Sequence, residues 1–318
     1  MNARTFSSLL ICTATLWSPI AASAADKVKV AAAFGTIWTS AQPAFCKDRG
    51  EFAKADLDVE IFTTRGGSET VQAVITGGTD IGYGPGINAV IAAYMQGANI
   101  KIVAGYFKGQ NDSFFYVPVD SPIKSIDDIS NISVAFSRPG SVSEQILLAL
   151  KSERHLNFTT VSAGGLDTTF TMTMTKQVDV GYSIPPAVLE AVEKGQVRVV
   201  FTGDAVPSLR NITSRVTITR DDFISTRRSI ATKFMQVLNS CIDWMYANPP
   251  QAAKMFAALN NVSESIATRA ISFYPREAMV FAPIAGFEQS IQDALDNKFI
   301  DKKPTEKQIK SMIDLIVH

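Results

Sequence analysis

Two arginines stand out because each lies in a loop between a short apolar run and a helical pattern. Arg65 precedes Gly66 and Gly67, and Arg138 precedes Pro139 and Gly140. A guanidinium beside exposed backbone N–H groups suits the capture of a carboxylate, sulfonate or phosphate. We therefore expect both arginines to contact an acidic group of a ligand. For Arg65, a solvent-facing position on an ordinary turn is the competing interpretation.

Other residues in similar loops offer hydroxyl groups, aromatic rings and helix N-termini. The remaining candidates for ligand contact are Thr36, Trp38, Gly84, Pro85, Phe114, Gly140, Ser141 and Ser183. Hydroxyl and backbone N–H groups bind oxygen atoms, and aromatic faces stack on an organic body. Core packing competes for Trp38 and Phe114, and Ser141 also opens a capping box with Glu144. Together these side chains indicate a small organic anion, such as a sulfonate, a carboxylate or an aromatic acid.

The elements that position these loops alternate between strands and helices. Strands are expected at residues 28–33, 59–63, 80–84, 100–105, 133–136, 159–162, 178–182 and 197–201. Helices are expected at residues 41–49, 69–76, 87–96, 142–151, 168–176, 186–194 and 227–247. This alternation predicts an α/β fold with mainly parallel sheets and helices on both faces. Ligands of such folds bind beyond the carboxyl ends of the strands, where the candidate loops lie.

The strands fall into two groups, which predicts two lobes. Extended segments at residues 113–117 and 215–219 separate the groups and are expected to form two crossover strands at a hinge. We expect lobe 1 to contain residues 25–114 and 217–318, and lobe 2 to contain residues 115–216. Each lobe should hold a mostly parallel sheet flanked by helices.

The composition excludes several classes of protein. Thirty Lys and Arg balance thirty Asp and Glu among 318 residues, so the chain lacks the basic footprint of a nucleic-acid binder. Two His and three Cys, with no C-x-x-C pair, argue against zinc sites and a dithiol redox motif. We expect no cofactor, no metal and no catalysis.

The N-terminus indicates export. Arg4 precedes a short apolar run, and an A-x-A signal ends at Ala24, so residues 1–24 are predicted to be a cleaved signal peptide. Export would place Cys46 and Cys241 in an oxidising compartment, where a disulfide forms readily. The alternative is two buried thiols, which the apolar helical stripe around Cys241 favours.

Several stretches resemble the solute-binding proteins of ABC importers for nitrate, sulfonates, taurine and pyrimidines, a group related to thiamine-pyrimidine biosynthesis proteins. Residues 52–60 (FAKADLDVE) resemble the family's F-x-x-x-G-L-D-V-E step, with Asp56 in place of the usual glycine. Further matches, which together span nearly all of the chain after residue 24, are residues 66–73, 77–82, 97–104, 120–129, 139–141 and 177–180, Trp244, and Asn248 with Pro249.

The resemblance implies a hinged, two-lobed "Venus flytrap" fold that closes on a ligand and presents it to a membrane permease. We therefore expect a periplasmic monomer that binds a small molecule and a permease. One alternative is an enzyme of the same fold that makes the thiamine pyrimidine, but such enzymes carry a Cys-rich segment and a reactive His. Here Cys46 and Cys241 are isolated, and His155 lies at an expected helix end. A sensory ligand-binding role is a second alternative.

Overall fold

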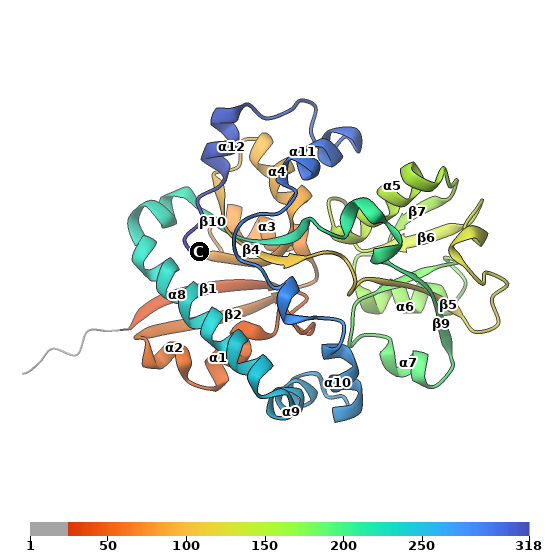
Figure 1. Ribbon diagram of the computed structural model, residues 1–318, viewed down its shortest axis with the longest axis horizontal. Coiled ribbons are helices and arrows are strands. Elements are labelled where there is room, and N and C mark those ends of the chain that lie inside the picture. The colour runs from red at the N-terminus through yellow and green to blue at the C-terminus, as the bar shows by residue number, and fades with distance from the viewer. Residues whose placement is uncertain (1–24, 318) are drawn as a thin grey trace, which may run out of the picture.

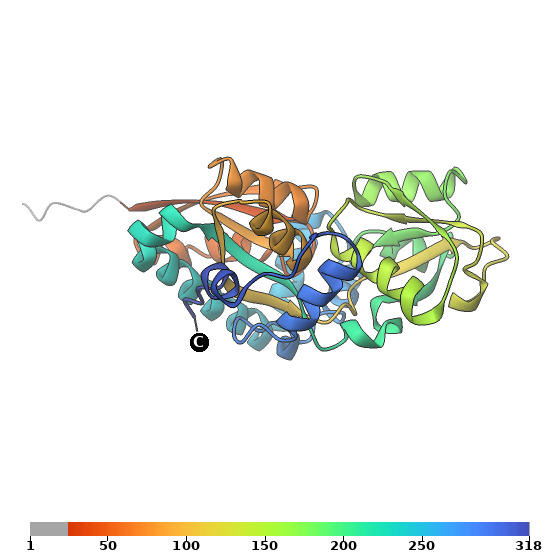
Figure 2. The same cartoon turned by 90° about the horizontal axis from the view of Figure 1, so that it is seen from above.

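The structure, a computed structural model, describes residues 25–317 and consists of two lobes that lie side by side (Figure 1). The expected signal peptide, residues 1–24, lies outside the described residues. Seen from above, the lobes meet along one boundary, which the chain crosses twice (Figure 2). We call the part that holds residues 114–202 lobe 2, and the part that holds the chain on either side of it lobe 1.

Lobe 1 is built on a sheet with the strand order β2-β1-β3-β10-β4. β1 pairs in parallel with β2 and β3, whereas β10 is antiparallel to β3 and β4. Four of the five strands therefore point the same way, and β10, which returns from lobe 2, is inserted against them. The strands are β1 (Asp26–Ala33), β2 (Leu57–Thr64), β3 (Ile81–Gly86), β4 (Ile100–Lys108) and β10 (Thr213–Arg220).

Helices cover both faces of this sheet with separate apolar layers. One layer joins α3, α4, α11 and α12 through residues such as Val74, Ile91 and Ile291. The other joins α1, α2, α8, α9 and α10 through residues such as Phe45 and Phe234. These helices are α1 (Gln42–Asp48), α2 (Glu51–Lys54), α3 (Gly67–Ile75), α4 (Ile87–Met95), α8 (Asp221–Ala247), α9 (Pro249–Asn260), α10 (Glu264–Ile271), α11 (Phe287–Asp296) and α12 (Glu306–Met312).

Lobe 2 repeats the plan of lobe 1. β5 is antiparallel to β8 and β9, β6 is parallel to β7, and a parallel bridge between Val134 and Val180 joins the two groups. The resulting order is β7-β6-β8-β5-β9, again with the strand that enters from the other lobe antiparallel to the rest. The elements are β5 (Phe114–Pro118), β6 (Ser133–Phe136), α5 (Val142–Arg154), β7 (Thr159–Ser162), α6 (Leu166–Met174), β8 (Gly181–Ser183), α7 (Leu189–Glu193) and β9 (Val197–Thr202).

Two short segments carry the chain between the lobes and bind each other. Residues 109–113 lead from β4 to β5, and residues 203–212 lead from β9 back to β10. The Gly109 N–H donates to the Ile212 carbonyl at 2.9 Å, and the Gly203 N–H donates to the Ser113 carbonyl at 2.8 Å. A side chain on Gly203 would collide with the Gln110 carbonyl, so only glycine permits this approach.

The α/β fold with two mostly parallel sheets agrees with the sequence prediction, but some boundaries differ. Of the expected crossover strands, residues 114–117 lie within β5 and residues 215–219 within β10, and each of these strands belongs to one sheet. The strand expected at 178–182 begins only at Gly181, although Val180 forms a bridge to Val134, and the Asp179 carboxylate accepts the Ser133 N–H and hydroxyl. Val188 has a φ of 68°, so α7 begins at Leu189 rather than at 186.

A disulfide joins Cys46 of α1 to Cys241 of α8. Both residues are buried against the sheet, so the apolar stripe of α8 and the disulfide occur together. The sequence favoured two free thiols, because Cys241 lies on an apolar helical stripe. Such a stripe indicates burial but does not show which residue lies opposite.

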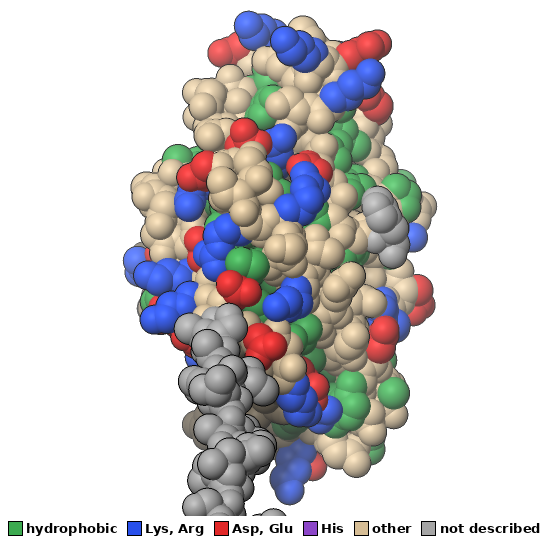
Figure 3. Space-filling model, turned by 90° about the vertical axis from the view of Figure 1, so that its left-hand side faces the viewer, with side chains coloured by type: hydrophobic (Ala, Val, Ile, Leu, Met, Phe, Trp, Pro, Cys, Tyr) green, Lys and Arg blue, Asp and Glu red, His purple; other side chains and the backbone are tan. Residues whose placement is uncertain are grey.

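The surface mixes charges of both signs. At the far end of lobe 1, Lys and Arg side chains are scattered among Asp and Glu side chains (Figure 3). Among residues 25–317, no helix has both the length and the apolar character that a membrane span requires.

The disulfide should contribute strongly to stability. We expect a Cys46→Ser/Cys241→Ser variant to lose about 2–5 kcal/mol of unfolding free energy, because its unfolded chain is no longer constrained. Urea unfolding followed by circular dichroism measures this loss, and reduction of the native protein should reproduce it. Equal midpoints for the oxidised, reduced and variant proteins would contradict the prediction.

Candidate functional site

A pocket lies between the lobes, where the carboxyl ends of both sheets face each other. Lobe 1 contributes loops after β1, β2 and β3, and lobe 2 contributes loops after β6 and β8. The space left for solvent is about 20 Å³, close to the size of one water molecule, so the lobes are closed over the pocket and must separate to admit an organic ligand. The lining residues are Ala33, Phe34, Ile37, Gly67, Gly84, Gly86, Ser137, Ser141, Val142, Ser143, Tyr182, Ile184 and Arg215.

Arg215 supplies the charge of the pocket. It comes from β10, is 3% exposed, and forms an ion pair with Asp112 of the first crossing segment. Nη1 lies 2.8 Å from Oδ2 of Asp112, and Nη2 donates to Oδ1 at 3.1 Å. Burial by itself would lower the pKa of the guanidinium, but the Asp112 carboxylate outweighs this effect and holds the pKa above its ordinary value. Arg215 is therefore charged at every physiological pH.

On the lobe 2 side of the pocket, three serines at or just before the start of α5 are hydrogen-bonded to one another: Ser137, Ser141 and Ser143. The Ser143 hydroxyl accepts the Ser137 N–H at 3.0 Å and lies 3.0 Å from the Ser137 hydroxyl and 2.9 Å from the Ser141 hydroxyl. Ser141 is the N-cap of α5 and accepts the Glu144 N–H at 3.3 Å. Burial raises the pKa of the neighbouring Tyr182, so its phenol stays protonated and can donate a hydrogen bond.

Helix N-termini from both lobes also point at the pocket. Gly67 is the first residue of α3, Gly86 is the N-cap of α4, and Ser141 is the N-cap of α5. A β-carbon on Gly67 would lie 2.9 Å from the Gly86 nitrogen, so glycine is needed for these two turns to meet. The partial positive ends of three helices and one guanidinium favour a ligand with negative charge or oxygen acceptors.

The sequence candidates are divided between the pocket and its surroundings. Gly84 and Ser141 line the pocket, and Pro85 and Gly140 are immediate neighbours of lining residues. Thr36 is exposed, and the Ser183 hydroxyl donates to the Ala187 carbonyl at 3.1 Å. Thr36, Pro85, Gly140 and Ser183 are not among the lining residues, so ligand contact at these four positions stays a prediction.

The two aromatic candidates lie in apolar cores. Trp38 is 1% exposed, packs edge-on against Phe45 and Phe256, and donates from Nε1 to the Tyr246 hydroxyl at 2.9 Å. Phe114 is equally buried and packs near Tyr116. Both positions correspond to the core-packing alternative that competed with ligand contact in the sequence.

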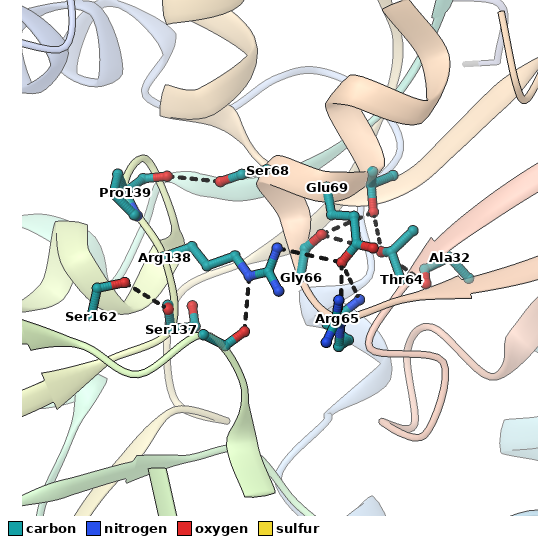
Figure 4. Close-up of polar contacts among 12 residues, drawn as sticks. Ala32, Thr64, Arg65, Gly66, Ser68, Glu69, Ser137, Arg138, Pro139 and Ser162 are labelled. Carbon is teal, nitrogen blue, oxygen red and sulfur yellow. Dashed lines mark hydrogen bonds and ion pairs between the residues drawn. The ribbon is translucent and has the colours of Figure 1, made fainter. Parts of the chain in front are cut away.

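The two arginines that the sequence singled out converge on one carboxylate at the rim (Figure 4). Arg138 lies in lobe 2, and its Nη1 is 3.5 Å from Oε2 of Glu69 in lobe 1. Its Nε donates to the Gly164 carbonyl at 2.8 Å. Arg65 is largely exposed and lies 3.8 Å from the same Glu69 oxygen. Arg138 and Glu69 therefore bridge the two lobes.

Sequence reasoning missed Arg215, Tyr182, Ser137 and Ser143. Arg215 lies in the run TSRVTIT, in which every residue is buried. A charged residue within a strand buried on both faces was the available signal, because such a charge needs a partner or a function. The burial of Arg215 could not be inferred from the sequence, because it depends on the position of β10 as an inner strand of its sheet.

The sequence model of the family described as "NMT1/THI5 like" matches residues 42–252, which is about two thirds of the chain. The chain belongs to the NMT1/THI5-like family. No curated protein sequence matches the chain.

Solved structures share the fold of this NMT1/THI5-like protein. The periplasmic aliphatic sulphonate binding protein SsuA from Escherichia coli has a TM-score of 0.73 and 18% identity, and the match covers 91% of this chain and 92% of that one. The alkanesulfonate-binding protein SsuA from Xanthomonas axonopodis pv. citri, bound to MOPS, has a TM-score of 0.76 and 15% identity over 92% and 99% of the chains.

A third similar structure is the ligand-binding component of an ABC-type import system from Staphylococcus aureus, with zinc bound. Its TM-score is 0.71 and its identity 12%, over 89% of this chain and 95% of that one. At these identities the likeness establishes the fold, which is the two-lobed fold of periplasmic binding proteins. It leaves the ligand to be argued from the pocket.

The buried ion pair gives a test of the site's energetics. We expect Arg215→Met to lose about 3–5 kcal/mol of unfolding free energy, because Asp112 remains buried without its partner. The Asp112→Asn/Arg215→Met variant should lose clearly less, because no unpaired charge is left. Urea unfolding measures both, and a double variant that is no more stable than the single one would contradict this account.

Proposed function

We propose that this protein is a solute-binding receptor that captures a small organic anion between its lobes and delivers it to the permease of an ABC importer. The observation that carries the proposal is the closed pocket in which Arg215, three serine hydroxyls and three helix N-termini converge. Such a set of donors suits a carboxylate or sulfonate group. Phe34, Ile37, Val142 and Ile184 supply apolar surface for the organic part.

The similar structures support this choice of ligand class and partner. Two of them are named as sulphonate-binding proteins, and the third as a component of an ABC-type import system. A zinc ion is a poor fit here, because the charged residue that lines the pocket is an arginine. Among the described residues, no three His, Cys, Asp or Glu side chains gather to hold a metal ion.

The contacts between the lobes support closure by hinge motion. Besides the Arg138–Glu69 pair, the Ser68 hydroxyl of lobe 1 donates to the Pro139 carbonyl of lobe 2 at 2.7 Å (Figure 4). Within residues 25–317, the two crossing segments are the chain connections between these rims, so opening breaks the contacts and leaves the hinge intact. A ligand that touches both lobes would then shift the population toward the closed form.

We also propose a periplasmic location, after removal of residues 1–24, and a binding role without turnover. The two lobes would move as the units expected from the sequence, near residues 25–114 with 217–318 and residues 115–216. We place the second limit slightly earlier, because β10 pairs with β4 from Thr213 onward.

Ligand binding tests the proposed function directly. We expect at least one compound from a panel of alkyl and aryl sulfonates and carboxylates to raise the melting temperature, because only the folded protein binds it. Calorimetry then gives the affinity, and chromatography of the mixture should recover the compound unchanged. Conversion of any panel compound, or the absence of a thermal shift on ligand-free protein, would contradict the proposal.

The rim arginine tests closure. If Arg138 acts through Glu69, Arg138→Met and Glu69→Gln should each weaken ligand binding by only about two- to fivefold, as expected for a partly exposed ion pair. Their combination should be no worse than either alone. Arg65→Met is the matched control and should have no effect.

A larger loss of affinity in Arg138→Met would indicate that Arg138 contacts the ligand directly. If Arg138 contacts the anion directly, its loss removes a charged hydrogen bond of about 1.5–3 kcal/mol, or at least tenfold in affinity. Glu69→Gln would then leave binding unchanged or improve it.

A further inference from the structure

The positive charge of the pocket is already balanced before a ligand enters. The Arg215 guanidinium faces the Asp112 carboxylate through two contacts, at 2.8 and 3.1 Å, and Asp112 is fully buried. In this setting water screens the two charges only weakly. A ligand anion that touches Arg215 is therefore also repelled by the Asp112 carboxylate. The pair as a whole is neutral.

The other charged groups near the pocket do not change this balance. At the rim, Glu69 pairs with Arg138 and with the exposed Arg65, and Glu144 lies close by, so these two cations and two carboxylates also cancel. The Glu144 carboxylate is half-buried, and it accepts the Gly140 N–H at 2.6 Å. Of the described residues that line the pocket, Arg215 is the one with a formal charge. What attracts an anion is therefore the partial charge of three helix ends and a set of hydrogen-bond donors.

We infer that Asp112 makes this pocket selective for singly charged anions, such as sulfonates and carboxylates, over doubly charged ones such as phosphonates and sulfate. The inference rests on the proposed function and narrows its ligand class. A second negative charge would enter a closed, nearly waterless space that holds no free counter-charge, where desolvation is costly. The helix N-termini and hydrogen-bond donors of the pocket can stabilise one negative charge on the ligand, but they do not offset a second one.

Matched pairs of compounds test the inference on the native protein. Propanesulfonate and propylphosphonate share one skeleton, as do benzenesulfonate and phenylphosphonate. At about pH 9.5 a phosphonate, whose second pKa lies above that of a phosphate ester, carries close to two charges, and at about pH 5 close to one, whereas a sulfonate carries one at both. We expect the sulfonate to bind at least about tenfold tighter at the higher pH, and this ratio to shrink to about threefold or less at the lower pH. The sulfonate corrects for titration of the receptor itself, including Glu144 and Glu69.

An isosteric variant assigns the effect to Asp112. Asp112→Asn keeps the shape but removes the counter-charge, so Arg215 is left with a free positive charge. We expect the phosphonate to gain at least about tenfold relative to the sulfonate at the higher pH. Asp293→Asn, which removes a partly buried carboxylate on α11 outside the pocket lining, is the control and should leave the ratio unchanged.

Each outcome decides between the two claims. Equal binding of both members of a pair at the higher pH overturns the inference and leaves the receptor function standing. An unchanged ratio in Asp112→Asn shows that Asp112 merely holds Arg215 in place, and this also overturns it. Binding of none of the four compounds, together with no binding across the wider panel, contradicts the proposed function itself. If Asp112→Asn does not fold, equal binding within the pairs on the native protein still overturns the inference.

Discussion

A buried ion pair joins the first crossing segment to β10 beside the pocket. Asp112 lies on the outgoing segment, and Arg215 follows the returning one by a few residues. Backbone hydrogen bonds from Gly109 and Gly203 join the same two segments. The hinge and the base of the ligand site are therefore one structure. If the lobes rotate about the crossing segments, the Arg215 guanidinium lies close to the axis of that rotation.

The plan of the two sheets explains why this point lies where it does. In each lobe, the strand that arrives from the other lobe is inserted antiparallel among strands that all point one way. The shared direction of the other strands brings their carboxyl ends, and the helix N-termini that follow, to one edge. Two such edges face each other across the boundary. A donor-rich pocket is the result, although few of its groups are charged.

The sequence predicts the layout of this fold well, because strand and helix periodicities are local properties. It also predicts that the loops after strands form the site, and Gly84 and Ser141 do line the pocket. It does not predict which side chain of a loop points inward. Trp38 turns into the lobe 1 core, where Phe45 and Phe256 fill the space around it. Arg215 was missed because its importance follows from the inner position of β10, and strand order is set by contacts far apart in the chain.

The disulfide has a mechanical consequence. It closes the chain between Cys46 and Cys241 into a covalent ring, and this ring contains both crossing segments and all of lobe 2. A pulling force applied at the two ends of the chain passes through the sulfur–sulfur bond and bypasses everything inside the ring. β1 and the helices after α8 bear the load, while the pocket loops after β2, β3, β6 and β8 are shielded from it. As long as the disulfide is intact, such a force cannot extend the chain between Cys46 and Cys241.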